Sequence, residues 1–259
     1  MEYEQIQLRR QSVLQLIKSK NVTTIEEIIT QLNLSDSTVR RDIKWLEEKK
    51  EISRFHGGVS PVNNEYDVFE VRNKLFVEEK EIIANYAASF VENNDIIYIG
   101  GGSTMVRLAA ALAKRTELSN VMVVTSTMNV AAMLAGRRKQ FKVVVLGGEL
   151  LYMDECIVSR STLDATKQIN YTKAFTGVHA LTPTRGVNQV SPELAELNQI
   201  LLECAKKNYL LTDHSKFGQI GPYNACKISD VDAVIVDRHP SVDKDMEGFD
   251  DMQRKIIQL

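Results

Sequence analysis

Apolar residues in the first sixty positions recur at helical spacing, whereas those from about residue 76 onward gather in short β-branched runs between helical patterns. Between these regions lies a polar stretch with little periodicity, SPVNNEYDVFEVRNK, which begins at a Ser-Pro pair. The change of pattern predicts a helical domain at residues 1–59, a linker at 60–75 and a larger α/β domain at 76–259.

Three helical patterns are expected in the first region. The first two carry apolar stripes made by Ile6, Val13, Leu16 and Ile17 and by Ile25, Ile28, Ile29 and Leu32. Thr24 and Glu27 form a capping box that predicts where the second helix starts. Asn33 then marks a tight break, and Ser35 is a suitable N-cap for the third helix.

The third pattern, SDSTVRRDIKWLEEKK, separates an apolar side from a cationic side. At about 100° per residue, Val39, Ile43 and Leu46 fall on one face and are expected in the core. The opposite side carries Ser37, Arg41 and Lys44, flanked by Arg40 and Trp45. An isolated helix of this kind would be interpreted as a solvated charged surface. Here the preceding helix and turn complete a helix-turn-helix, which places the cationic face in the DNA major groove.

A short alternating segment, EISRF, is followed by His56 and by the pair Gly57-Gly58. This pattern predicts a β-hairpin that forms a wing beside the third helix and brings Arg54 and His56 near the phosphate backbone. The residues expected to contact DNA are Ser35, Ser37, Thr38, Arg40, Arg41, Lys44, Arg54 and His56.

The stretch from Leu8 to Val59 resembles the DeoR-type winged helix-turn-helix of bacterial sugar-metabolism repressors. LSDSTVRRDIKWLE and ISRFHGG reproduce that family's Ser-x-x-Thr-aliphatic-Arg-Arg-Asp-aliphatic run and its Arg-x-His-Gly-Gly turn. The resemblance implies a transcriptional regulator that binds an operator in double-stranded DNA, most often as a repressor.

Five runs rich in β-branched residues recur in the second region: DIIYI (95–99), VMVVT (121–125), KVVVLGG (142–148), NYLLTD (208–213) and AVIVD (233–237). Helical patterns accompany them at 78–92, 104–115, 127–136 and 192–207. Because uninterrupted apolar runs are typical of strands buried on both faces, this order predicts a mainly parallel, doubly wound sheet.

Ligands of such sheets bind beyond the carboxyl ends of the strands. The first run ends in a glycine loop that opens a helix, a combination that can hold an anion. We expect a phosphate-binding pocket made by Gly100, Gly101, Gly102, Ser103, Thr104, Thr125, Ser126, Gly147, Gly148, Asp213 and Lys216. Any single loop of this kind is equally compatible with a structural turn.

This region is similar to the DeoR-type C-terminal sensor domain, itself similar to ribose-5-phosphate isomerase. The matching stretches are KEIIANYAASFV, IIYIGGGSTM, VVTS, VVVLGGEL, AFTGVHAL and LLTDHSKFG. The resemblance implies a Rossmann-like (ribose-5-phosphate-isomerase-like) α/β domain that senses a phosphorylated sugar or related metabolite and mediates homo-oligomerisation. It implies effector contacts at Gly102, Ser103, Thr104, Thr125, Gly148, Asp213 and Lys216.

The sequence departs from the family pattern at four positions. Gly100 replaces an aspartate, Ser126 an asparagine, Arg160 a glycine and Asn198 a lysine. These departures leave two possibilities open, a different phosphorylated effector or weakened sensing.

Composition indicates the class of protein and the compartment in which it is expected. Of the 259 residues, 44% are hydrophobic and 25% charged, which is ordinary for a globular protein with a sizeable core. Cys156, Cys204 and Cys226 are widely spaced, and there is no CxxC or Cys/His cluster, so we expect no disulfide framework, metal site or cofactor. A charged N-terminus and the lack of a long apolar run predict a cytosolic protein.

Charge limits the mode of DNA binding. The chain has 32 basic and 34 acidic residues, and the first sixty positions have ten and nine. Such a small net charge gives little sequence-independent attraction to phosphates, so affinity should come from specific contacts of a dimer or tetramer.

Three functions remain open. The first is a repressor of a carbohydrate-utilisation operon under effector control, and the second is a DNA-binding regulator whose larger domain only oligomerises. The third is a sugar-phosphate isomerase, which needs a positioned base such as Glu149, Asp154 or Asp213 and a stabilising cation such as Lys216. Because no paired-carboxylate motif is present, we expect no catalysis.

Overall fold

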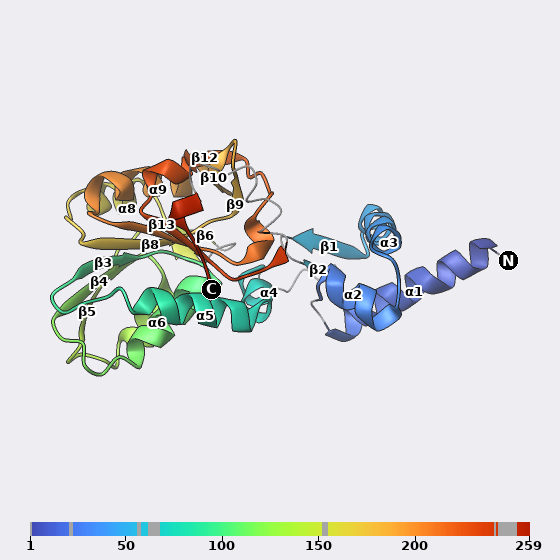
Figure 1. The fold of residues 1–259 in the computed structure, drawn as a ribbon, viewed down its shortest axis with the longest axis horizontal. Coiled ribbons are helices and arrows are strands. Elements are labelled where there is room, and N and C mark those ends of the chain that lie inside the picture. The colour runs from blue at the N-terminus through green and yellow to red at the C-terminus, as the bar shows by residue number, and fades with distance from the viewer. Residues whose placement is uncertain are drawn as a thin grey trace. The chain divides into compact units, whose positions relative to one another are not determined.

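The computed structural model describes residues 2–20, 23–55, 58–61, 68–151, 155–240, 242 and 253–259. The chain divides into two compact units, Met1–Leu75 and Phe76–Leu259 (Figure 1). No helix within the described ranges is long and apolar enough to cross a lipid bilayer.

The first unit contains a helix-turn-helix followed by a hairpin. Its elements are α1 (Glu2–Lys20), α2 (Ile25–Leu32), α3 (Asp36–Glu48), β1 (Ile52–Phe55), β2 (Gly58–Pro61) and α4 (Val68–Lys74). β1 and β2 are antiparallel, and Thr23 pairs with Val59 to widen the hairpin. The three predicted helices and the predicted wing are therefore confirmed.

Local hydrogen bonds explain the boundaries of α2 and α3. Thr24 and Glu27 form both bonds of the predicted capping box, at 3.1 and 3.0 Å. Asn33 ends α2 in the left-handed conformation, with φ 50°. The Ser35 hydroxyl then accepts a hydrogen bond from the Thr38 N–H at 3.3 Å and starts α3. The turn between the two helices is thus encoded locally.

The range 60–75 is more regular than the sequence indicates. Ser60 and Pro61 complete β2 by pairing with Ser53 and Ile52, and α4 occupies much of the rest. A seven-residue helix spans barely two turns, which is too short for its apolar period to stand out in the sequence.

The second unit is built on a seven-stranded parallel sheet in the order β14-β13-β11-β8-β3-β4-β5. The strands are β3 (Ile96–Ile99), β4 (Val121–Thr125), β5 (Phe141–Val145), β8 (Lys173–Gly177), β11 (Asn208–Leu211), β13 (Ala233–Val236) and β14 (Ile256–Gln258). The helices are α5 (Val77–Ala88), α6 (Ser103–Ala113), α7 (Met128–Leu134), α8 (Arg160–Lys167) and α9 (Pro192–Cys204). The parallel sheet predicted from the uninterrupted apolar runs is confirmed.

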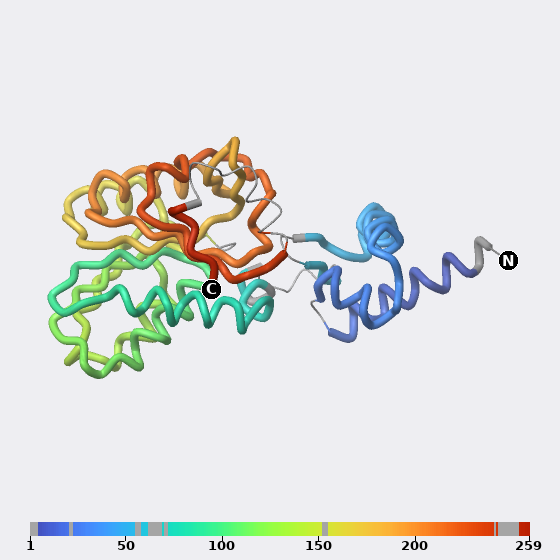
Figure 2. Tube along the Cα trace, in the orientation of Figure 1, coloured from blue at the N-terminus to red at the C-terminus, as the bar shows by residue number. Residues whose placement is uncertain are grey.

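Helices cover both faces of this sheet. Ile97 and Ile99 pack in one cluster with residues of α5, α6 and α7, whereas Tyr98 packs in another with residues of α8 and α9. Alternate residues of β3 thus enter opposite layers, as in a doubly wound fold. In Figure 2, the green first half of the unit lies mostly below its yellow and orange segments.

Several elements were not predicted. The most important is β8, which lies in the middle of the sheet but reads KAFTG, with a lysine at one end and a glycine at the other. A small antiparallel sheet contains β9 (Ala180–Thr182), β10 (Gly186–Gln189) and β12 (Tyr223–Cys226), and β6 (Leu150–Leu151) pairs with β7 (Cys156–Ile157). The described residues also include the short 3-10 helices η1 (His214–Lys216), η2 (Ile228–Asp230) and η3 (Gln253–Lys255).

Candidate DNA interface and ligand site

The α3 helix presents opposite faces to the core and to solvent. Val39, Ile43 and Leu46 are buried, as the helical spacing predicts. Ser37, Arg41 and Lys44 follow one another at the i, i+4, i+7 spacing of a single face, and all three are exposed. Within the described residues, the Arg41 and Lys44 side chains form no hydrogen bond or ion pair, so their donors face solvent.

The other predicted DNA contacts have partners within the protein. The Ser35 hydroxyl caps α3 and lies 2.8 Å from that of Thr38. Arg40 pairs with Asp36 one turn earlier at 2.8 Å, and Arg54 lies 3.7 Å from Glu47. These pairs are exposed and hold their groups only weakly. His56 lies outside the described residues.

An acidic residue of α3 is fully buried, which the sequence analysis did not anticipate. Asp42 accepts hydrogen bonds from Arg9 at 2.6 and 3.0 Å and from Arg10 at 3.1 Å. The Arg10 guanidinium also stacks 4.2 Å from the ring of Trp45. Asp42 therefore ties α1 to the helix that carries Arg41. Its position one turn from Val39, on the apolar side of the helix, was the available signal.

We expect Asp42→Asn to destabilise the first unit by about 2–4 kcal/mol, because two arginines lose a charged acceptor in a buried place. Trp45 is the single tryptophan of the chain, so its fluorescence during urea unfolding reports on this unit. Asp36→Asn, which breaks an exposed pair, is the matched control and should cost less than about 1 kcal/mol. Equal losses of unfolding free energy in the two variants would contradict the conclusion that Asp42 ties α1 to α3.

In the second unit, the glycine loop after β3 contacts the carboxyl end of β8. The Gly100 N–H donates to the Phe175 carbonyl at 2.9 Å, and a Cβ placed on Gly177 would lie 3.5 Å from the Gly101 carbonyl oxygen. The Gly177 carbonyl also accepts from the Gln189 amide at 3.0 Å. The strand order reverses between β3 and β8, which is where open α/β sheets bind ligands.

The start of α6 offers unused donors at this point. Gly102 precedes the helix with φ 103° and provides no side-chain cap. Ser103 and Thr104 follow, both largely buried, and neither hydroxyl has a hydrogen bond within the described part of the chain. Together with the first backbone N–H groups of the helix, these hydroxyls can hold an anion.

A buried ion pair lies after β11, one strand beyond β8 in the sheet. Asp213 accepts a hydrogen bond from the Ser215 N–H at 3.1 Å and another from the Ser215 hydroxyl, and the Lys80 ammonium lies 3.8 Å from its carboxylate. Burial by itself raises the pKa of Asp213, but the charges of Lys216 and Lys80 and the bonds from Ser215 lower this pKa to about 2.

The sequence did not single out Lys80, the partner of Asp213. It shares the buried face of α5 with Ile83, Ala84 and Ala87, at helical spacing from them. A lysine among core positions of an amphipathic helix is the signal that could have identified it, because a buried ammonium needs a partner.

The depressed pKa of Asp213 predicts acid sensitivity. An aspartate whose pKa is lower in the folded than in the unfolded state stabilises the fold above about pH 4 and loses this contribution as the pH falls toward 2. We expect about 2 kcal/mol of the second unit's stability to disappear over that range. Calorimetric unfolding at pH 5 and pH 3 should show a smaller loss for Asp213→Asn than for the unaltered chain. Identical losses of stability in the two proteins would contradict the lowered pKa of Asp213.

Other predicted ligand residues have internal hydrogen bonds. Thr125 and Ser126 are buried, and their hydroxyls bond to the Thr127 N–H at 3.1 Å and to the Tyr98 hydroxyl at 2.9 Å. A Cβ on Gly148 would lie 2.3 Å from the Thr162 hydroxyl. That hydroxyl donates to the Gly147 carbonyl at 2.8 Å. These residues pack the sheet edge and the start of α8 together.

The positions that depart from the family pattern differ in surroundings. A Cβ on Gly100 would lie 3.5 Å from the Phe175 carbonyl oxygen, an ordinary contact. Arg160 is exposed and pairs with Asp164 and Glu196. Asn198 is buried on α9, and its amide nitrogen has no hydrogen-bond partner among the described residues.

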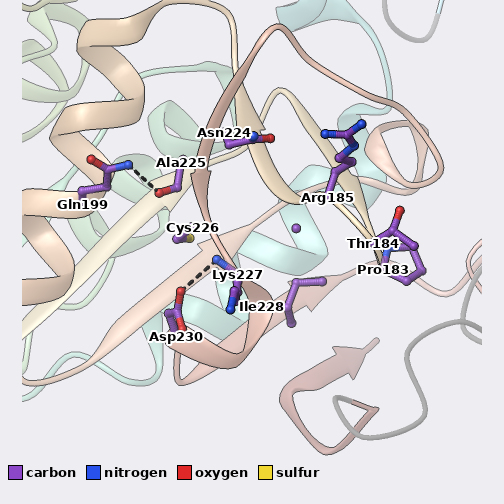
Figure 3. Close-up of a pocket in the computed structure, with 11 residues that line it drawn as sticks. Pro183, Thr184, Arg185, Gln199, Asn224, Ala225, Cys226, Lys227, Ile228 and Asp230 are labelled. Atoms are coloured by element: carbon purple, nitrogen blue, oxygen red, sulfur yellow. Dashed lines mark hydrogen bonds between the residues drawn. The ribbon is translucent and has the colours of Figure 1, made fainter.

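A separate cavity of about 610 Å³ lies beside the small antiparallel sheet (Figure 3). Its walls come from the β9–β10 turn, from β12 and from η2, with Arg185 and Lys227 among the lining residues. Gln199 of α9 donates to the Ala225 carbonyl at 3.1 Å at its edge. None of the predicted ligand residues lines this cavity.

A winged helix-turn-helix with a free cationic face, followed by an α/β unit of this kind, defines a DNA-binding transcriptional regulator with an attached sensor domain. The model of the DeoR-like helix-turn-helix domain matches residues 9–65, and that of the DeoR C-terminal sensor domain matches residues 75–238. The chain belongs to the DeoR family, as its sequence motifs indicate.

Full-length relatives are transcriptional regulators. The chain is 31% identical over 252 residues to the HTH-type transcriptional regulator FruR of Bacillus subtilis, with 96% of each chain covered. It is 30% identical to the glycerol-3-phosphate regulon repressor of Escherichia coli, covering 90% of this chain and 92% of that one. It is 29% identical to the lactose phosphotransferase system repressor of Staphylococcus epidermidis, covering 89% and 92%.

Solved structures are similar only at the level of the fold. Ribose 5-phosphate isomerase A from Methanocaldococcus jannaschii gives a TM-score of 0.38 at 17% identity, over 53% of each chain. Translation initiation factor eIF-2B from Pyrococcus horikoshii gives 0.45 at 12% identity, over 88% of this chain and 81% of that one. Both similarities are too distant to support a conclusion about activity.

Proposed function

We propose that the chain represses a carbohydrate-utilisation operon and that a phosphorylated sugar or related metabolite, bound at the carboxyl ends of β3, β8 and β11, controls its affinity for the operator. The relatives named as repressors support the direction of regulation. The observation that carries the ligand assignment is the start of α6, where the Ser103 and Thr104 hydroxyls are largely buried and lack partners within the described residues.

The chemistry of this site suits a phosphorylated compound. A phosphate at the start of α6 would accept from two hydroxyls and from backbone N–H groups at the positive end of the helix dipole. Lys216 and Lys80 lie near Asp213 at the end of β11, on the other side of β8 from β3, and supply positive charge. The Gln189 amide donates to the Gly177 carbonyl at the end of β8, where β8 contacts the glycine loop after β3. From there, it can orient hydroxyl groups of the ligand.

For DNA, we propose that Arg41 reads bases and that Lys44 contacts phosphates, with Ser37 beside them on the same face. Arginine can bind guanine through two hydrogen bonds in the major groove, while lysine contacts backbone oxygens. A dimer or tetramer would place two such helices on successive half-sites.

The isomerase alternative is disfavoured by the state of Asp213. A general base works best with a pKa near the operating pH, whereas the pKa of Asp213 is about 2 and its oxygens already accept hydrogen bonds from Ser215. We therefore propose that the second unit binds its ligand without converting it.

Thermal unfolding with a panel of ligands tests this function. The panel contains inorganic phosphate, glycerol 3-phosphate, fructose 1-phosphate, fructose 6-phosphate and galactose 6-phosphate, each organic compound paired with its unphosphorylated parent. At a hundred-fold excess over Kd, the bound compound should raise the Tm by about 5–10 °C. A flat response to the whole panel would favour a second unit that only oligomerises, and turnover of any compound would revive the isomerase.

A further inference from the structure

Phe76 is the first residue of the second unit, at the point where the chain arrives from α4. It precedes α5 with φ 50° and ψ 47°, a left-handed conformation that bulky residues seldom adopt. Its carbonyl accepts a hydrogen bond from the Lys80 N–H at 3.0 Å. The backbone at this junction is therefore fixed to the first turn of α5.

The Phe76 ring contacts the loop that follows β11. It meets the His214 imidazole edge to face, with ring centroids 4.6 Å apart, and the Lys80 ammonium lies 6.0 Å from its centre. His214 begins η1, directly after Asp213. A single side chain at the junction thus contacts both elements that supply the Lys80–Asp213 pair.

His214 is itself held firmly. Its N–H donates to one Asp237 oxygen at 2.7 Å, and its Nδ1 lies 2.6 Å from the other. Its ring stacks on His239 at 4.0 Å, with 12° between the planes. Because η1 is anchored at the end of β13, a movement of the first turn of α5 changes the contact between Phe76 and His214.

We propose that Phe76 and His214 form the contact through which the strand-end site changes the DNA affinity of the first unit. An anion that draws Lys80 away from Asp213 would displace the first turn of α5 relative to η1. Phe76, which precedes this turn, would move with it, and the chain that leads back to α4 would follow. This inference rests on the proposed ligand site for its biological use, but the coupling itself can be tested with DNA alone.

Coupling between two sites is reciprocal. If ligand binding alters the affinity for the operator, operator binding must alter the affinity of the strand-end site for its ligand. We would select an operator duplex from a random DNA library with the unaltered full-length protein. Hydrogen–deuterium exchange with and without this duplex should change at least two-fold in peptides covering η1 and the first turn of α5. In Phe76→Leu, this change should disappear while the operator affinity stays within two-fold.

His214→Gln removes the imidazole but keeps a polar group near Asp237, and it should behave like Phe76→Leu. Because the two variants disrupt the same contact from opposite sides, agreement between them rules out a folding defect of one variant as the cause. Phe90→Leu is the matched control, because Phe90 makes similar aromatic contacts with Tyr86 and Tyr209, at 5.2 and 5.0 Å. The inference is overturned if operator binding leaves η1 unchanged in the unaltered protein, or if both variants retain the change. If operator binding changes the exchange of η1 as expected but no phosphorylated compound binds the protein, only the proposed ligand is contradicted.

Discussion

Replacing Arg41 by alanine should weaken operator binding by about 5- to 150-fold for each half-site, because a bidentate contact to a base contributes about 1–3 kcal/mol. The expectation follows from the α3 face on which Arg41 is exposed and free of partners among the described residues. The loss should be accompanied by relaxed specificity at the base pair that Arg41 reads.

Lys44→Ala should act differently, because lysine contacts phosphate. Its affinity should fall by similar factors for operator and unrelated DNA, and the slope of log K against log salt should decrease by about 1 for each half-site. Fluorescence anisotropy of a labelled duplex at several salt concentrations measures both effects. Lys18→Ala removes the same charge from an exposed position on α1 and serves as the control. If Arg41→Ala and Lys44→Ala left affinity and salt slope unchanged, α3 would not be the recognition helix.

Lys216→Ala should weaken binding of the phosphorylated ligand by about 10- to 150-fold, because a charge-assisted hydrogen bond contributes about 1.5–3 kcal/mol. Lys216 belongs to η1, beside Asp213, at the carboxyl end of β11. Isothermal titration calorimetry with the panel compound that gives the largest thermal shift measures the change. Operator affinity without ligand should stay within two-fold.

A lysine at the other end of the same strand provides the matched control. Lys206 is exposed just before β11, so Lys206→Ala removes an equal charge away from the strand-end site. The ligand assignment would fail if both variants bound the compound equally well. Loss of operator and ligand binding together in Lys216→Ala would indicate misfolding, which a melting curve would reveal.

Local signals predicted the first unit well. The Thr24 capping box, the Asn33 break and the Ser35 cap are short-range features, and each forms the hydrogen bonds or the backbone conformation that its residue type favours. The apolar period of α3 likewise identified its buried face. These elements are visible in the sequence because neighbouring residues determine them.

What the sequence did not reveal depends on distant partners. Asp42 is buried only because Arg9 and Arg10 reach it from α1, and Lys80 only because Asp213 lies opposite. The strand β8 is central because β3 and β11 pair with it on either side, not because of its own composition.

The predicted ligand pocket was only partly resolved by sequence reasoning. Strand ends in a parallel sheet meet at one edge, so the pattern predicts a ligand site at the loops after β3 and β11. It could not distinguish a hydroxyl that faces a ligand from one already bonded inside the protein. The Ser103 hydroxyl has no hydrogen bond among the described residues, whereas the Ser126 hydroxyl is bonded to that of Tyr98.

Operator binding by the unaltered full-length protein, with and without the phosphorylated compound selected by thermal shift, tests the central claim most directly. Anisotropy titrations should show that the phosphorylated compound changes the operator Kd by at least 5-fold, while its unphosphorylated parent has no effect. An unchanged Kd with every compound, or an equal change with the unphosphorylated parent, would contradict the claim that this regulator responds to a phosphate-bearing ligand.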